Sequence, residues 1–82
     1  MSVYEALTGA NLKQFIYHGK RYPCDNRHIC MKANTVTFMI GRLGNEQSLT
    51  CSLRELRVRE RGDTIYIVNR RGETVITICK SS

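Results

Sequence analysis

Short segments in which apolar and polar residues alternate recur along this chain, and they constrain its fold more than any other feature. The clearest covers residues 35–40, where Val36, Phe38 and Ile40 alternate with threonine and methionine. Because successive side chains of a β-strand point to opposite faces, this period of two predicts a strand with one strongly apolar face. Similar segments follow at close spacing with glycine-containing turns between them, which predicts a small antiparallel β domain.

The first third of the chain predicts one helix and one hairpin. Ser2 and Glu5 form the Ser-x-x-Glu pattern of a capping box and Gly9 follows, so we expect a short helix over residues 3–8. His18-Gly19 separates two strand-like segments, and glycine supplies the positive φ that a tight hairpin turn requires.

The remainder of the chain predicts further strands. Residues 29–31 and 35–40 are expected to form a hairpin, and residues 41–47 a loop. A second Ser-x-x-Glu pattern at 52–55 predicts a single helical or 3₁₀ turn. Residues 56–79 then contain three strand-like segments joined by tight turns, which predicts a three-stranded meander.

The chain has 82 residues, which predicts one small domain over residues 1–82. We expect a mainly β fold of the α+β class, with a short N-terminal helix. Its strands form either a small antiparallel sheet on which the helix packs or a partly open barrel. The order of an N-terminal helix followed by curved strands is similar to the outline of Sm-like barrels, a likeness that carries no function.

The charge of the chain is unbalanced, with 13 lysines and arginines against seven acidic residues and a net charge of +6. Such an excess predicts attraction to nucleic acid or to acidic surfaces. We find no apolar stretch approaching the ~18 residues of a membrane span, and no secretory signal pattern. The chain is therefore expected in the cytoplasm, or in the host cytoplasm if a phage encodes it, with no membrane partner and with reduced cysteines.

Six arginines gather in the last third of the chain. They are Arg54, Arg57, Arg59, Arg61, Arg70 and Arg71. If Leu56 and Val58 face a core, the period of two sends Arg57, Arg59 and Arg61 to the opposite face at a spacing of roughly 6.8 Å. A row of guanidinium groups suits a line of phosphates, so we predict that this group binds nucleic acid.

Lys20 and Arg21 form a second basic group, next to the aromatic residues Phe15, Tyr17 and Tyr22. Aromatic rings with basic neighbours are typical of surfaces on which single-stranded bases stack. We therefore include Lys20 and Arg21 among the expected nucleic-acid-binding residues. The competing interpretation is that Phe15 belongs to the core, since a small domain without tryptophan needs its large apolar side chains there.

The sequence does not predict an enzyme. Cys24 and His28 are the nearest approach to a nucleophile and base, and no third orienting group is evident. We therefore expect no catalytic residues, no cofactor and no small-molecule substrate.

Metal binding is a separate question for the residues Cys24, His28, Cys30 and Cys51. Sulfur and imidazole are ligands that zinc prefers, but their spacing matches no standard zinc motif. We favour an interpretation in which Cys51 and Cys79 pack as small apolar side chains, while Cys24 and Cys30 lie in a loop region. The sequence leaves open whether Cys24, His28, Cys30 and Cys51 bind zinc.

In size, positive charge and β-rich pattern, the chain resembles the Bof (Lxc) type of small corepressor from temperate phages. This resemblance rests on properties of the whole chain, so it assigns no roles to single residues. It implies a non-enzymatic transcriptional corepressor, or accessory factor, that binds a repressor protein on its operator DNA and strengthens repression. In that arrangement the arginines contact phosphates, and an exposed apolar surface formed by Val36, Phe38 and Ile40 contacts the repressor.

Three alternatives remain open at this level. A small RNA-binding regulator would bind single-stranded RNA without a partner, through residues such as Tyr17 or Tyr22. An inhibitor of a host enzyme is suggested by the order of elements after Thr35, which resembles Rof-type inhibitors of Rho. That family is acidic, however, and has a long helix that this chain lacks. A zinc-stabilised interaction module is the third.

Overall fold

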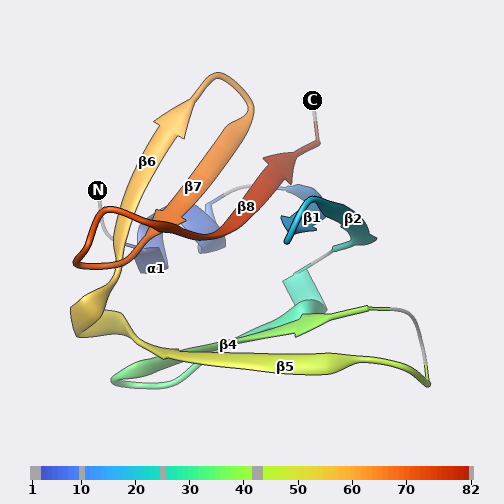
Figure 1. Ribbon diagram of the computed structural model, residues 1–82, viewed down its shortest axis with the longest axis horizontal. Coiled ribbons are helices and arrows are strands. Elements are labelled where there is room, and N and C mark those ends of the chain that lie inside the picture. The colour runs from blue at the N-terminus through green and yellow to red at the C-terminus, as the bar shows by residue number, and fades with distance from the viewer. Residues whose placement is uncertain (1–2, 10, 25, 42–43, 82) are drawn as a thin grey trace.

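Two antiparallel sheets and one short α-helix make up the computed structural model, which describes residues 3–9, 11–24, 26–41 and 44–81 (Figure 1). In chain order the elements are α1 (Val3–Thr8), β1 (Leu12–Tyr17), β2 (Lys20–Pro23), a 3₁₀ turn η1 (Asn26–His28), β3 (Ile29–Met31), β4 (Thr35–Ile40), β5 (Gln47–Ser52), a 3₁₀ turn η2 (Leu53–Glu55), β6 (Arg57–Arg61), β7 (Thr64–Val68) and β8 (Thr74–Lys80). The mainly β, α+β class predicted from the sequence is confirmed.

The larger sheet has five strands in the order β2-β1-β8-β7-β6, and the smaller has three in the order β3-β4-β5. The meander expected over residues 56–79 is confirmed as β6, β7 and β8. The first strand then pairs with the last, since β1 runs antiparallel to β8. Strands β2 and β6 are therefore the two edges of the five-stranded sheet.

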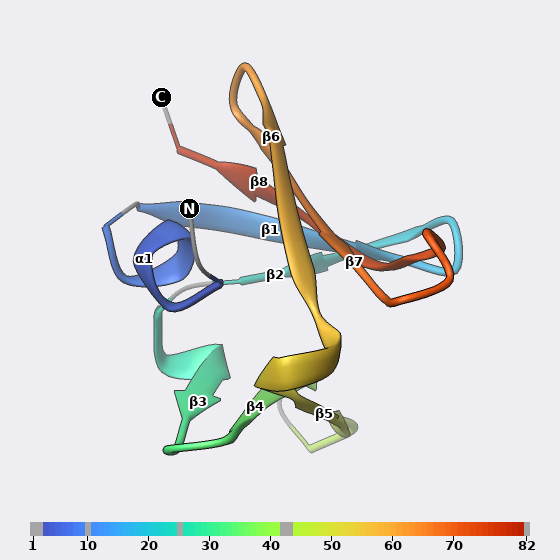
Figure 2. The same ribbon diagram turned by 90° about the vertical axis from the view of Figure 1, so that its left-hand side faces the viewer.

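The core lies between the two sheets, with α1 at one side of the gap (Figure 2). The rings of Phe15 on β1 and Phe38 on β4 meet edge to face, with centroids 5.9 Å apart, and both side chains are fully buried. Helix α1 adds its buried residues Val3, Ala6 and Leu7 to the same cluster. Contacts between the sheets and the helix therefore join distant parts of the chain into one core.

The burial of β4 corrects the proposed partner-binding surface. Val36, Phe38 and Ile40 are each 0% exposed, because their side chains face the five-stranded sheet. Strand β4 is also the central strand of its sheet, paired with β3 and β5, and offers no free edge. The alternation was interpreted correctly as a strand, but its apolar face belongs to the core.

Local sequence signals account for most turns. The hairpin at His18-Gly19 is confirmed, with φ of 50° and 76°, the pair of positive values typical of a type I′ turn. The 3₁₀ turn over residues 52–55 is confirmed as Leu53–Glu55, although Ser52 forms no side-chain cap bond there. The expected helix is confirmed as α1; the proposed cap Ser2 lies outside the described residues.

Candidate nucleic-acid interface

The outer face is defined here as the side of the five-stranded sheet turned away from the three-stranded sheet. On the edge strand β6, Arg57, Arg59 and Arg61 are exposed, while Val58 packs against the core. Leu56, just before the strand, is buried. The predicted arrangement of these three arginines on one exposed face is therefore confirmed.

Strand register carries this face across the whole sheet. One row contains, in order, Arg59, Tyr66, Thr77, Ile16 and Arg21, each paired with the next. Neighbouring strands lie about 4.8 Å apart, so this row spans roughly 19 Å between the backbones of its terminal arginines. An arginine thus stands at each edge of the outer face, and a tyrosine stands beside one of them.

A recess of about 370 Å³ lies on the outer face beside β6. It is lined by Arg59, Glu60, Arg61, Tyr66, Val68, Gly72 and Thr74. Val68 is only 5% exposed, yet it does not belong to the core cluster between the sheets. The recess therefore combines an apolar floor, a half-buried aromatic ring and two guanidinium groups.

Glu60 is the acidic residue of β6, and it lines the same recess as Arg59 and Arg61. Glu60 alternates with the arginines on β6, and its register partner Ile65 is a core residue. Lys80 Nζ donates a hydrogen bond to Glu60 Oε2 at 3.3 Å, an ion pair that offsets the carboxylate charge. Within the described residues, no ion pair involves the three arginines of β6. Their charges remain available to a ligand.

Arg70 and Arg71 occupy the exposed turn between β7 and β8, and Asn69 orders this turn. Asn69 Oδ1 accepts hydrogen bonds from the backbone N–H groups of Arg71 and Glu73, both at 3.0 Å. The Asn69 N–H donates to the Glu73 carbonyl at 2.9 Å. Arg70 and Arg71 also line a shallow recess with Glu55 of η2, where Arg54 is exposed. This acidic neighbour weakens the local positive field.

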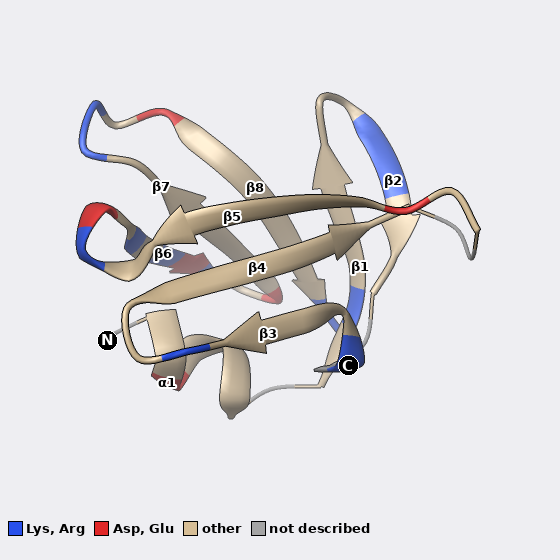
Figure 3. Ribbon diagram, turned by 90° about the horizontal axis from the view of Figure 1, so that it is seen from below, with Lys and Arg blue, Asp and Glu red and all other residues tan. Residues whose placement is uncertain are grey.

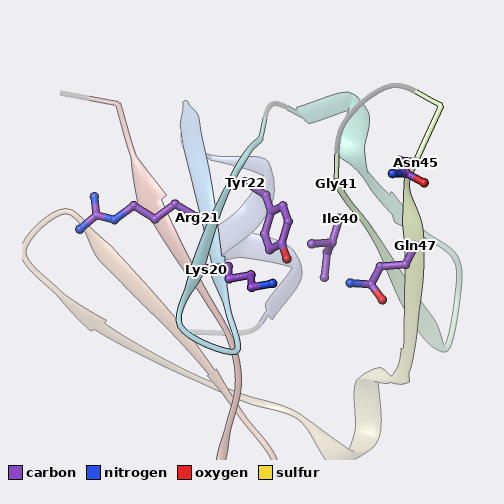
Figure 4. Close-up of a pocket in the computed structure, with 7 residues that line it drawn as sticks. All are labelled: Lys20, Arg21, Tyr22, Ile40, Gly41, Asn45 and Gln47. Atoms are coloured by element: carbon purple, nitrogen blue, oxygen red, sulfur yellow. The ribbon is translucent and has the colours of Figure 1, made fainter.

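The predicted basic residues form two groups in space. Figure 3 shows basic segments at η2, at β6 and at the β7–β8 turn, and another on β2 at the opposite edge of the sheet. Lys20 and Arg21 do not act together, because adjacent strand residues face opposite sides. Arg21 points away from the three-stranded sheet, whereas Lys20 points toward it (Figure 4). Arg21 therefore belongs to the outer face and Lys20 does not.

A groove of about 550 Å³ runs between β2 and the β4–β5 hairpin (Figure 4). Lys20, Tyr22 and Gln47 point into it, on either side of the buried side chain of Ile40. The prediction of an exposed aromatic platform near Lys20 and Arg21 is wrong. Phe15 is 0% exposed, and both Tyr17 and Tyr22 pack against the core cluster, so these rings do not form one exposed stacking surface.

The cysteines and His28 are dispersed. Cys24 lies in the connection between β2 and η1, as expected, and is buried in the core cluster, whereas Cys30 is exposed on the strand β3 rather than in a loop. Cys51 is half-buried against the core as expected, whereas Cys79 alternates with core residues and lies on the outer face. Across the described ranges, no three Cys, His, Asp or Glu side chains gather as a metal site.

Tyr66 is the site residue that sequence reasoning did not identify. It lies within the apolar run Ile65-Tyr66-Ile67-Val68, which is part of the middle strand of the predicted meander. A usable signal was present, because alternation places Tyr66 on the face opposite Ile65 and Ile67. Only the register with β6 shows that this face is also the arginine face.

Comparison with known proteins found no matching family model, no similar curated protein and no similar solved structure. Among the described residues, no helix is both long and apolar enough to span a membrane.

Proposed function

We propose that this protein is a non-enzymatic accessory factor in gene regulation that contacts nucleic acid through its outer face. The observation that carries this proposal is the exposed row of Arg57, Arg59 and Arg61 on an edge strand, with no acidic partner among the described residues. Guanidinium groups in such a row are suited to successive phosphates, because each presents several N–H donors to an anionic oxygen.

The regulatory setting indicated by the sequence is that of a corepressor acting with a repressor on its operator. In that setting, a factor that binds the repressor–DNA complex raises the repressor's apparent affinity by a coupling free energy, typically ~1–3 kcal/mol. The buried residues of β4 take no part in it. An RNA regulator would use the same outer face without a partner, and the position of Tyr66 favours this second setting.

Binding of a fluorescently labelled duplex and of labelled single-stranded oligonucleotides tests the proposal. Anisotropy titrations with the intact protein at several salt concentrations should show affinity that falls steeply as salt rises, because bound arginines displace counterions. Replacing Arg57 and Arg59 together with alanine should weaken binding. Lys32→Ala, which removes one positive charge at an exposed position beside β3, is the control away from the outer face and should not.

Absence of binding, or binding insensitive to salt, would contradict direct contact through the outer face. The corepressor setting has its own test, a mobility shift with a repressor and its operator. There the wild-type protein should increase retention of the complex, and the Arg57→Ala, Arg59→Ala double variant should not.

A further inference from the structure

The recess beside β6 contains more than a phosphate-binding surface requires. Contact with phosphates needs positive charge and hydrogen-bond donors, which the guanidinium groups of Arg59 and Arg61 already provide. The recess also contains the half-buried ring of Tyr66 and the apolar side chain of Val68. An aromatic ring and an apolar floor are suited to a flat apolar group, and the nearest such group to a phosphate is a nucleobase.

A base within a duplex cannot fill this recess, because its faces are already stacked on its neighbours. An unpaired base has a free face and can stack on an aromatic side chain. The recess of about 370 Å³ falls in the lower part of the range for small-ligand sites, about 300–1,000 Å³, which is consistent with one base and part of its sugar. The ligand that matches both charge and shape is therefore a single strand.

We propose that the outer face binds single-stranded nucleic acid, with one unpaired base against Tyr66 and the adjoining phosphates at Arg59 and Arg61. This inference rests on the proposed function and narrows its ligand class. Strand register supports it, because Arg59 lies directly opposite Tyr66 and Arg61 follows two positions later on the same face. A strand running along β6 would meet a cation on either side of its Arg59 contact.

The side chains of the recess indicate weak base preference. Stacking uses the π face that every base possesses, so it tolerates changes of sequence. Besides the two arginines, the polar side chains that line the recess are Thr74 of β8 and Glu60, whose carboxylate is paired with Lys80. Hydroxyls both donate and accept, so they do not enforce one hydrogen-bonding pattern. We therefore expect a backbone-and-stacking site.

Comparison of matched oligonucleotides tests this inference with the intact protein. Anisotropy titrations use labelled oligo-U, oligo-dT and a hairpin duplex of the same length, all at one salt concentration. The variants are Tyr66→Ala, Tyr66→Phe and Tyr4→Ala. Tyr4 is the matched control, since it is 59% exposed on α1. Loss of one stacked base lowers affinity by about 5- to 150-fold, so Tyr66→Ala should weaken single-strand binding by about fivefold or more.

The expected result has three parts. Single strands bind more tightly than the duplex, Tyr66→Phe retains most of the affinity, and Tyr4→Ala matches the wild type. Circular dichroism checks that each variant is folded. Tyr66→Leu replaces the alanine variant if the latter does not fold, because leucine keeps apolar volume but has no ring, and it should also weaken binding.

Two results would overturn the inference while leaving the proposed function in place. One is tighter, salt-dependent binding of the duplex, which leaves nucleic-acid contact through the outer face in place. The other is salt-dependent single-strand binding that Tyr66→Ala and Tyr66→Leu leave unchanged. If the intact protein binds neither kind of oligonucleotide, the inference fails, and the mobility shift with a repressor and its operator decides the proposed function.

Discussion

Arg59 on β6 lies directly opposite Tyr66 on β7 in the register of the five-stranded sheet. Residues opposed in this way have Cβ atoms about 4.5–5.5 Å apart, so the guanidinium and the ring share one small area of the outer face. This pairing places a cation beside an aromatic ring that is only half-buried. The proposed ligand class follows from that juxtaposition more than from the total charge.

The arginines of β6 should contribute separately to the salt dependence of nucleic-acid binding. For single strands, each phosphate contact adds about 0.7 to the slope of log affinity against log salt. Single Arg57→Ala, Arg59→Ala or Arg61→Ala variants should each lower that slope by about this amount. Anisotropy titrations over several salt concentrations measure it, and Lys32→Ala should leave the slope unchanged. If all four variants show the same salt slope as the wild type, the arginines of β6 do not contact the nucleic acid.

Among the glycines in the described part of the chain, Gly41 should tolerate substitution least. It adopts φ of 130°, and an added Cβ would lie 2.8 Å from the carbonyl oxygen of Asn45. Gly41→Ala should therefore destabilise the fold by ~2 kcal/mol or more, since the clash is with backbone. Gly19→Ala is the control, because Gly19 also has positive φ but faces open space. It should cost only ~1 kcal/mol.

Urea denaturation followed by circular dichroism measures both glycine variants. A similar loss of stability in the two would show that backbone conformation alone, without the close approach at Gly41, determines the cost.

Phe38 should stabilise the fold rather than bind a partner. Its ring is fully buried between the sheets and meets Phe15 edge to face. Phe38→Ala should lower the free energy of unfolding by ~3–5 kcal/mol, which approaches the whole stability of a small domain. Phe38→Leu retains more volume and should remain folded with a smaller loss. Thr37→Ala changes the opposite face of β4 and should cost ~1 kcal/mol, through the hydrogen bond with Thr50.

The midpoint of urea unfolding distinguishes these outcomes. A folded Phe38→Leu variant of unchanged stability would contradict the core assignment of β4.

Local features of this chain were predictable because their causes lie within a few residues. Positive φ at Gly19 closes the first hairpin, and alternation identifies β4 and β6 as strands. The outward row of arginines followed from Leu56 and Val58 by the same alternation. These predictions needed only the preferences of a short segment and the assumption that apolar faces turn inward.

The remaining features depend on contacts between distant segments. Pairing of β1 with β8 joins the first hairpin to the meander in one five-stranded sheet, and nothing near either strand specifies this pairing. The second sheet then covers Val36, Phe38 and Ile40, whose alternation alone could not distinguish a core face from a docking face. Tyr66 was missed for the same reason, since its role depends on the register between β6 and β7.

Cysteine reactivity should follow exposure and thiol pKa. Cys30 is exposed and Cys24 is 6% exposed. Burial, and then the negative charge of Glu55, raise the pKa of Cys51. A raised pKa leaves less thiolate at a given pH, so iodoacetamide near pH 7.5 should modify Cys30 well before Cys51. Raising the pH should narrow the difference between the modification rates of Cys30 and Cys51. Glu55→Gln should increase the rate at Cys51. Peptide mass spectrometry measures both rates; equal rates at Cys30 and Cys51 would contradict this.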